Sequence, residues 1–94
     1  MGSMIEVREL VWTAWNIGHI ARHNVTPDEV EEVCHGEYMT SETYKGRIRV
    51  VGPTRTGRML AAILAPRGEG SYFVVTAHDC NAGERQRYRE VKGS

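Results

Sequence analysis

Residues 47–77 read RIRVVGPTRTGRMLAAILAPRGEGSYFVVTA. Three apolar runs in this stretch are separated by two short runs rich in proline and glycine, which are typical of turns. We therefore predict three β-strands, over residues 47–52, 58–65 and 71–77, joined by turns at 53–57 and 66–70. Connections this short join antiparallel neighbours. The nearly unbroken apolar run at 59–65 predicts that the second strand lies in the centre of the sheet.

Side chains alternate between the two faces of a strand, so the same stretch predicts which residues face a core. In the first strand Ile48 and Val50 are expected to face helices, while Arg47 and Arg49 face outward. In the last strand we expect two opposed sets, with Phe73, Val75 and Ala77 on one face and Tyr72, Val74, Thr76 and His78 on the other.

Upstream of this stretch, the sequence predicts a short strand followed by two helices. A loose apolar alternation over residues 6–12 indicates the strand. Thr13 is a suitable cap for a helix over residues 14–23, and Asn24 tolerates the left-handed conformation that ends a helix. In Thr26-Pro27-Asp28-Glu29, a capping residue precedes proline and two acids. This pattern predicts the start of a second helix, which ends at Gly36.

The remaining segments complete an α+β fold. Residues 39–44 are a candidate fourth strand, and Asn81-Ala82-Gly83-Glu84 predicts the start of a basic helix that runs to about Val91. We expect one domain over residues 4–92, with a short N-terminal strand, two helices, an antiparallel sheet of three or four strands and the basic C-terminal helix. Residues 1–3 have the composition of a cloning scar.

A formal net charge of zero conceals two oppositely charged halves. Residues 1–44 carry a formal charge of −6 and residues 45–94 carry +6, and ten of the twelve basic residues are arginine. Arginine binds phosphate through two parallel hydrogen bonds and stacks on bases, so an RNA surface is one interpretation. A solvated surface with internal ion pairs, such as Arg47 and Arg49 with Glu37 and Glu42, is the other.

The sequence indicates an intracellular protein without a membrane segment. Its longest apolar run, residues 59–65, is far shorter than the roughly 20 residues of a membrane-spanning helix. Cys34 and Cys80 are distant in sequence and are expected to be reduced, with Cys34 on the apolar side of its helix. We expect a cytoplasmic location.

Metal and nucleotide motifs give little support for cofactor chemistry. His19 and His23 have the i, i+4 spacing of metal ligands, and Cys34-His35 and His78-x-Cys80 are further candidates, but no CxxC or HExxH motif accompanies them. P-loop, GxGxxG and GxSxG motifs are also absent from the sequence. We predict neither a metal nor a cofactor. The histidine, tyrosine and arginine residues suffice for metal-independent RNA cleavage through the 2′-hydroxyl.

Taken in order, several short motifs resemble the BrnT family of type II toxins. They are Trp12-x-x-Trp15-Asn16, then His19-Ile-Ala-Arg-His23-Asn-Val25, a helix of Pro-x-Glu-Val type, the strand Val74-Val-Thr-Ala77, and the helix Glu84-Arg-x-Arg-Tyr88. The resemblance covers residues 12–89. It implies a RelE-like ribonuclease fold, inhibition of translation by RNA cleavage, and a cognate antitoxin as partner. The sequence departs from the family pattern at Asn24, usually glycine, and at His78 and Gln86, usually arginine.

Combining the residues with the resemblance leads to a hypothesis for the site. The catalytic candidates are His78, His23, His19, Arg85 and Tyr88, and the nucleic-acid-binding candidates are Arg47, Arg49, Arg58, Arg87 and Arg89. RNA and an antitoxin are the expected partners, with a homodimer or a toxin–antitoxin hetero-oligomer as candidate assemblies. The alternative function is a non-catalytic module of the same fold that binds RNA or protein. Trp12 and Trp15 are expected to pack in the core or at an interface rather than to stack on bases.

Overall fold

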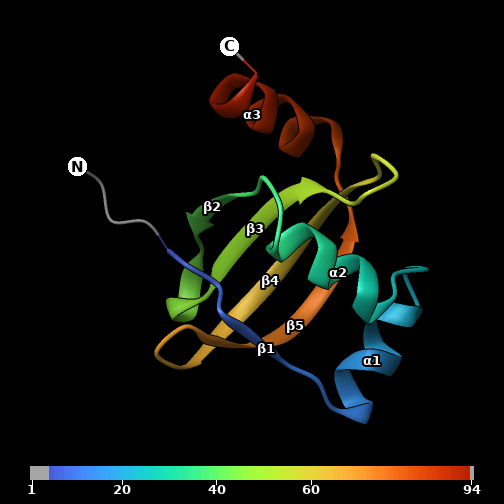
Figure 1. The fold of residues 1–94 in the computed structure, drawn as a ribbon, viewed down its shortest axis with the longest axis vertical. Helices are drawn as coiled ribbons and strands as arrows, with labels where there is room; N and C mark the ends of the chain where they lie inside the picture. Colours follow the sequence, from blue (N-terminus) through green and yellow to red (C-terminus); the bar gives the residue numbers. More distant parts are fainter. Residues whose placement is uncertain (1–4, 94) are drawn as a thin grey trace.

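The computed structural model describes residues 5–93, so the expected cloning scar at residues 1–3 lies outside the described residues. The chain forms one mixed sheet with helices on both of its faces (Figure 1). In chain order the elements are β1 (Glu9–Val11), α1 (Ala14–Ala21), α2 (Pro27–Cys34), β2 (Met39–Glu42), the short 3-10 helix η1 (Tyr44–Gly46), β3 (Ile48–Pro53), β4 (Met59–Gly68), β5 (Ser71–Asp79) and α3 (Ala82–Lys92).

The sheet has five strands in the order β1-β5-β4-β3-β2. Strands β2 to β5 form the expected antiparallel meander, and β4 lies at the centre as its apolar run predicts. The strand count differs from the expected three or four because β1 joins the same sheet, pairing in parallel with the start of β5. This pairing joins segments about 60 residues apart, so no local turn signal announces it.

All three helices begin where their capping residues predict. The side chains of Thr13, Thr26 and Asn81 each accept a hydrogen bond from the backbone N–H three residues later, and each helix returns the bond to its cap. Helix α1 ends at Ala21, two residues before the expected end. Hydrogen-bonded turns continue the chain to Asn24, whose φ of 59° is the left-handed conformation expected there.

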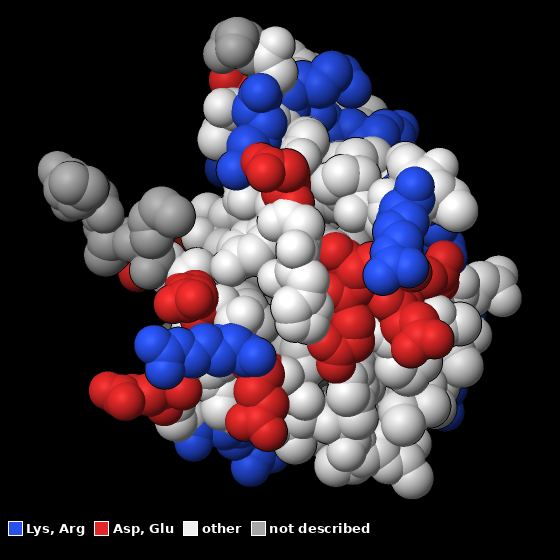
Figure 2. All heavy atoms as spheres, viewed as in Figure 1, with Lys and Arg blue, Asp and Glu red and all other residues white. Residues whose placement is uncertain are grey.

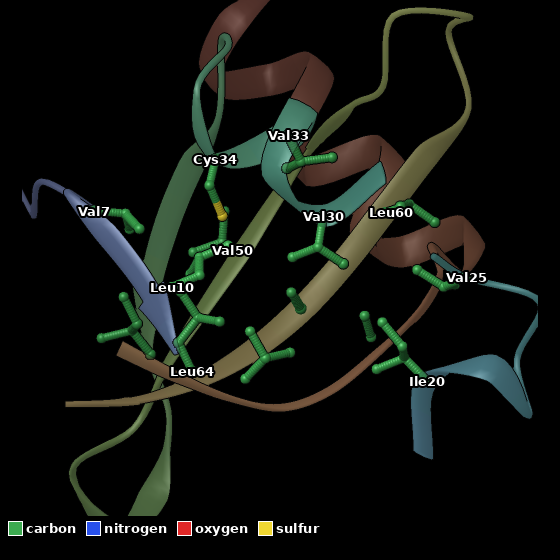
Figure 3. Packing of buried hydrophobic residues seen from close by; sticks show 14 residues of the cluster. Val7, Leu10, Ile20, Val25, Val30, Val33, Cys34, Val50, Leu60 and Leu64 are labelled. Atoms are coloured by element: carbon green, nitrogen blue, oxygen red, sulfur yellow. The ribbon is translucent and has the colours of Figure 1, made fainter. Parts of the chain in front are cut away.

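The main core lies between the sheet and the two N-terminal helices (Figure 3). Ile20 of α1 and Val30 and Val33 of α2 pack against sheet residues, among them Val50 and Leu64. All five side chains are essentially inaccessible to solvent. Burying an aliphatic side chain of this size stabilises a fold by about 1.5 to 3 kcal/mol, so this layer holds the helices on the sheet. Ile48 and Val50 face the helices, as their alternation predicts.

A smaller core on the opposite face holds α3. It contains Met39, Val51, Ala61 and Cys80, with Tyr88 of α3 packed against them. Helix α3 has no fully buried residue, so its attachment depends largely on this patch.

In β5 the side chains do not alternate regularly between the two faces of the sheet, because a β-bulge interrupts the strand. The pairing of β5 with β4 shifts between Thr76 and Val74, leaving Val75 without a partner. Val74 and Ala77 both enter the main core. The expected grouping of Val74 with Thr76 and His78 is therefore wrong: Phe73, Thr76 and His78 lie on the other face, opposite Ala65, Ile63 and Ala61 of β4.

Among residues 5–93 no helix is long and apolar enough to span a membrane.

Candidate functional site

The sheet face opposite α1 and α2 is only partly covered by α3, and we call it the open face. Two cross-strand rows of side chains define it: Ser41, Arg49, Ile63 and Thr76 in one row, and Met39, Val51, Ala61 and His78 in the next. Arg47 immediately precedes β3 and shares the side of Arg49. From the strand spacing and the rise per residue, the Cα atoms of His78 and Arg49 lie about 12 Å apart. The open face thus carries basic groups and a histidine on neighbouring strands of one surface.

Three of the four histidines lie in a row along the β5 side of this face. The ring centroids of His19 and His23 are 6.1 Å apart, and those of His23 and His78 are 6.3 Å apart. Helix α1 packs against β5, and this contact brings residues separated by more than fifty positions together. The structure therefore brings together the three histidines predicted as catalytic candidates.

The hydrogen bond of His78 fixes which ring nitrogen is available for proton transfer. Its Nδ1 lies 2.8 Å from the backbone carbonyl oxygen of Asp79. A carbonyl oxygen only accepts, so Nδ1 carries the proton of the neutral ring and Nε2 keeps a free lone pair. His78 is half-buried, and this arrangement suits it to act as a base.

Arg49 lines a groove between the β2–β3 side of the open face and the start of α3. The groove encloses about 260 Å³, and its polar lining comprises Ser41, Arg49, Asn81, Glu84 and Arg87. Nε of Arg49 lies 3.6 Å from a carboxylate oxygen of Glu84, is buried, and has no hydrogen-bond partner. Arg49 therefore pairs with Glu84 rather than with Glu37 or Glu42. Its partly unsatisfied guanidinium and Arg87 make this groove suited to an anion.

Arg58 is placed differently from the other arginines. Its Nε and Nη2 donate to the Asp79 carboxylate at 2.7 and 3.3 Å, and its Nη1 donates to both oxygens of Glu29 at 3.0 Å. Nη1 also bonds the carbonyl oxygen of Asn24 at 2.8 Å. These bonds raise the pKa of Arg58, chiefly through Asp79. The guanidinium that we expected to bind RNA is thus already occupied within the fold.

Two further candidates on α3 also have intramolecular partners. The Tyr88 hydroxyl donates to the carbonyl oxygen of Glu37 at 2.6 Å, and burial of the ring raises the pKa of Tyr88. Arg85 is exposed, and its Nη1 donates to the carbonyl oxygen of Cys80 at 2.6 Å. Arg89 is exposed on the same helix. Tyr88 therefore serves chiefly to hold α3 to the loop before β2.

Trp15 and Phe73 border the histidine row, and sequence reasoning did not include them in the site. Trp15 stacks on His19 with a centroid distance of 5.0 Å and on Phe73 with 6.1 Å. Trp15 is 59% exposed, so it is not a core residue, and an interface position stays a prediction. Trp12 is half-buried and donates to Glu31. The i, i+4 spacing of Trp15 and His19 was visible in the sequence, but the approach of Phe73 depends on the β5 bulge.

The cysteines are not suited to nucleophilic chemistry. Cys34 and Cys80 are free and buried, and burial raises the pKa of Cys34 to about 12 and that of Cys80 to about 11. Thiols in such surroundings are poor nucleophiles. Within the described residues, no group of three His, Cys, Asp or Glu side chains is arranged to hold a metal ion.

Comparison with known proteins gives a match in structure but none in sequence. No protein-family model and no curated protein sequence matches the chain. The fold is similar to the crystal structure of the Brucella abortus ribonuclease toxin BrnT, with a TM-score of 0.64 and 18% sequence identity. The superposition covers 78% of this chain and 96% of the toxin. The chain thus shares its α+β fold, a sheet with flanking helices, with that protein.

Proposed function

We propose that this chain is the toxin of a type II toxin–antitoxin system and inhibits translation by cleaving RNA in the cytoplasm. Residues 4–92 would act as one catalytic domain. The fold it shares with the Brucella abortus ribonuclease toxin supports the class of activity. The observation that carries the proposal is the convergence of His19, His23 and His78 beside the arginines of the open face.

Cleavage of RNA at its own 2′-hydroxyl needs only proton transfer and charge stabilisation. His78, with Nε2 free, removes the 2′-hydroxyl proton, and the 2′-oxygen attacks the adjacent phosphorus. The bond from phosphorus to the 5′-oxygen breaks, leaving a 2′,3′-cyclic phosphate. Protonated His23, whose ring is 6.3 Å from that of His78, gives a proton to the departing 5′-oxygen. His19 lies next in the row and can exchange a proton with His23.

Arginines supply the charge stabilisation. Arg49 and Arg87 line one groove, and Arg47 lies on the same face, so these three are assigned to the phosphate and its neighbours. Arg85 and Arg89, both exposed on α3, extend the basic surface. Tyr88, a catalytic candidate, and Arg58, a nucleic-acid-binding candidate, are left out of the proposed site because their polar groups are bonded within the fold.

A cognate antitoxin is the second proposed partner. An antitoxin that neutralises this activity must cover the open face or its histidine rim, and an acidic segment matches the arginines there. The resulting assembly is a hetero-oligomer in which the RNA site is inaccessible.

The decisive test compares His78→Ala with His35→Ala. His35 is the fourth histidine and lies after α2, where its Nδ1 contacts the backbone of Glu31, so it controls for loss of an imidazole. On induced expression in bacteria, we expect the unaltered chain and His35→Ala to arrest growth and degrade RNA. In vitro, His78→Ala should cleave RNA 10²- to 10⁴-fold more slowly, and a chelator should not slow the unaltered protein.

Equal cleavage by His78→Ala and the unaltered chain would contradict the assignment of the base. Healthy growth and intact RNA with every variant would favour the non-catalytic binding module instead.

A further inference from the structure

A row of rings continues from the histidines along the rim of the open face, with Trp15 exposed and His19 and Phe73 half-buried. Trp15 stacks on His19 with 8° between the ring planes and on Phe73 with 26°. Beyond Phe73, the Arg67 guanidinium carbon lies 4.8 Å from the ring centroid. The row thus runs from Arg67 through Phe73, Trp15 and His19 toward the proposed catalytic histidines.

Core packing does not explain this row. Trp15 remains 59% exposed, although the neighbouring Asn16 and Ile20 of the same helix are fully buried. Trp12, by contrast, packs against the main core and its indole N–H donates to Glu31 at 2.9 Å. An exposed tryptophan held in place by two neighbouring rings is pre-organised to contact a planar partner.

The dimensions of the row match a short single strand of nucleic acid. The ring centroids of Trp15 and His19 are 5.0 Å apart and those of His19 and His23 are 6.1 Å apart, so the row from Trp15 to His23 is at most about 11 Å long. Stacked bases are spaced about 3.4 Å apart, so this length accommodates three to four of them. The row ends at His78, where the proposed function places the phosphate that is cleaved.

We propose that Trp15, with His19 and Phe73, forms a base-stacking subsite for single-stranded RNA next to the cleavage site. Arg67 at the far end contacts a phosphate or a base of the same strand. Bases in a duplex are stacked on each other and cannot reach these rings, so the subsite selects unpaired RNA. This inference rests on the proposed ribonuclease function, because it extends the path of that substrate.

Binding of an uncleavable strand tests the subsite separately from catalysis. The probe is a labelled single-stranded 2′-O-methyl oligonucleotide, which has no free 2′-hydroxyl to attack the phosphate, compared with its duplex. Trp15→Ala should weaken single-strand binding by about 5- to 150-fold, the range for loss of one base-stacking contact. Trp15→Phe should retain most of the affinity, and Ile17→Ala, which removes a 41% exposed side chain from α1, should bind like the unaltered chain.

Tryptophan fluorescence supplies a second readout. Stacking should quench Trp15 in the unaltered chain, and Trp15→Ala, which keeps Trp12, should show almost no quenching. Equal affinity of Trp15→Ala and the unaltered chain, or no binding of the single strand, would overturn the proposal.

A parallel cleavage assay on the 2′-hydroxyl form of the same strand distinguishes the two proposals. Binding that depends on Trp15 without any cleavage would sink the ribonuclease proposal and leave the stacking subsite standing. Cleavage by the unaltered chain, together with unchanged binding by Trp15→Ala, would contradict the stacking subsite and leave the ribonuclease proposal standing.

Discussion

Arg58 illustrates how one side chain can join three segments of a small fold. It begins next to β4 and bonds Asp79 at the end of β5, Glu29 in the first turn of α2, and the backbone between α1 and α2. Its side chain is about one-quarter exposed, so water screens these bonds only in part. Basic residues near a proposed RNA site therefore do not all serve the RNA.

Replacing Arg58 by alanine should destabilise the fold by about 2 kcal/mol at pH 7, because hydrogen bonds to charged groups are lost and two carboxylates are left unpaired. Chemical denaturation monitored by circular dichroism measures the change. Arg58→Lys keeps the charge but not the planar fork, so its stability should be intermediate. No loss of stability in Arg58→Ala would show that these bonds contribute nothing.

The pH dependence of that loss follows from the two carboxylates. The pKa of Glu29 is lowered from its ordinary value of 4.5, chiefly by the Thr26 backbone N–H and then by Arg58, and that of Asp79 from 3.8, chiefly by Arg58. A lowered pKa gives stability that is present above the unfolded value and lost as pH falls through the folded value. The difference between the unaltered chain and Arg58→Ala should therefore shrink below about pH 4.

Among the elements, β5 has the largest effect on the candidate site. Phe73 and His78 are five residues apart, so regular alternation would place them on opposite faces. The bulge at Val75 removes this mismatch and aligns them with Ala65 and Ala61, which share one face of β4. Because of this one extra residue, Phe73 and His78 lie on the same face of the sheet and both contribute rings to the row.

Helix α3 is the least firmly attached helix, since none of its residues is buried and Tyr88 provides its main contact. We predict that Tyr88→Ala increases hydrogen exchange selectively in the α3 amides, because the helix detaches without unfolding the sheet. Tyr88→Phe removes only the hydroxyl bond to Glu37 and should cost about 1 kcal/mol. Mass-spectrometric exchange that rises equally in β3 to β5 would contradict this local detachment.

At the level of the whole molecule, the carboxylates of α2 and the basic side chains of α3 lie in different regions. Figure 2 shows carboxylates gathered over α2 on the helix-covered face and basic side chains over α3. The α2 carboxylates include Asp28, Glu31 and Glu32, which line a shared hollow with Arg55. This separation orients an anionic strand toward the α3 side and away from α2.

The salt dependence of RNA binding tests whether the basic residues of the open face and α3, rather than those beside α2, contact the phosphates. Three phosphate contacts from Arg47, Arg49 and Arg87 predict a slope of about −2 for the logarithm of the association constant against the logarithm of salt concentration. Arg49→Ala with Arg87→Ala should bring the slope to about −0.7. Arg55→Ala, a matched loss of charge beside α2, should leave it unchanged. An equal reduction of the slope by Arg55→Ala would contradict localised binding.

Much of the fold can be read from local patterns. Capping residues specify the starts of the three helices, and the apolar run at 59–65 specifies the central strand, because both signals depend on neighbours within a few residues. Asn24 likewise marks the end of the α1 region through its own backbone preference. The order of the elements follows from such signals taken together, whereas the BrnT-like fold is expected only from the resemblance to that family.

Long-range contacts decide the rest. Four features cannot be predicted from neighbouring residues in the sequence. They are the parallel pairing of β1 with β5, the bulge at Val75, the bonds of Arg58 to Glu29 and Asp79, and the exposure of Trp15. Each depends on which distant segments lie side by side, and that is settled when the core packs. The sequence therefore predicts that histidines and arginines are the candidate functional residues, whereas the packing of the core determines which of them lie on one surface.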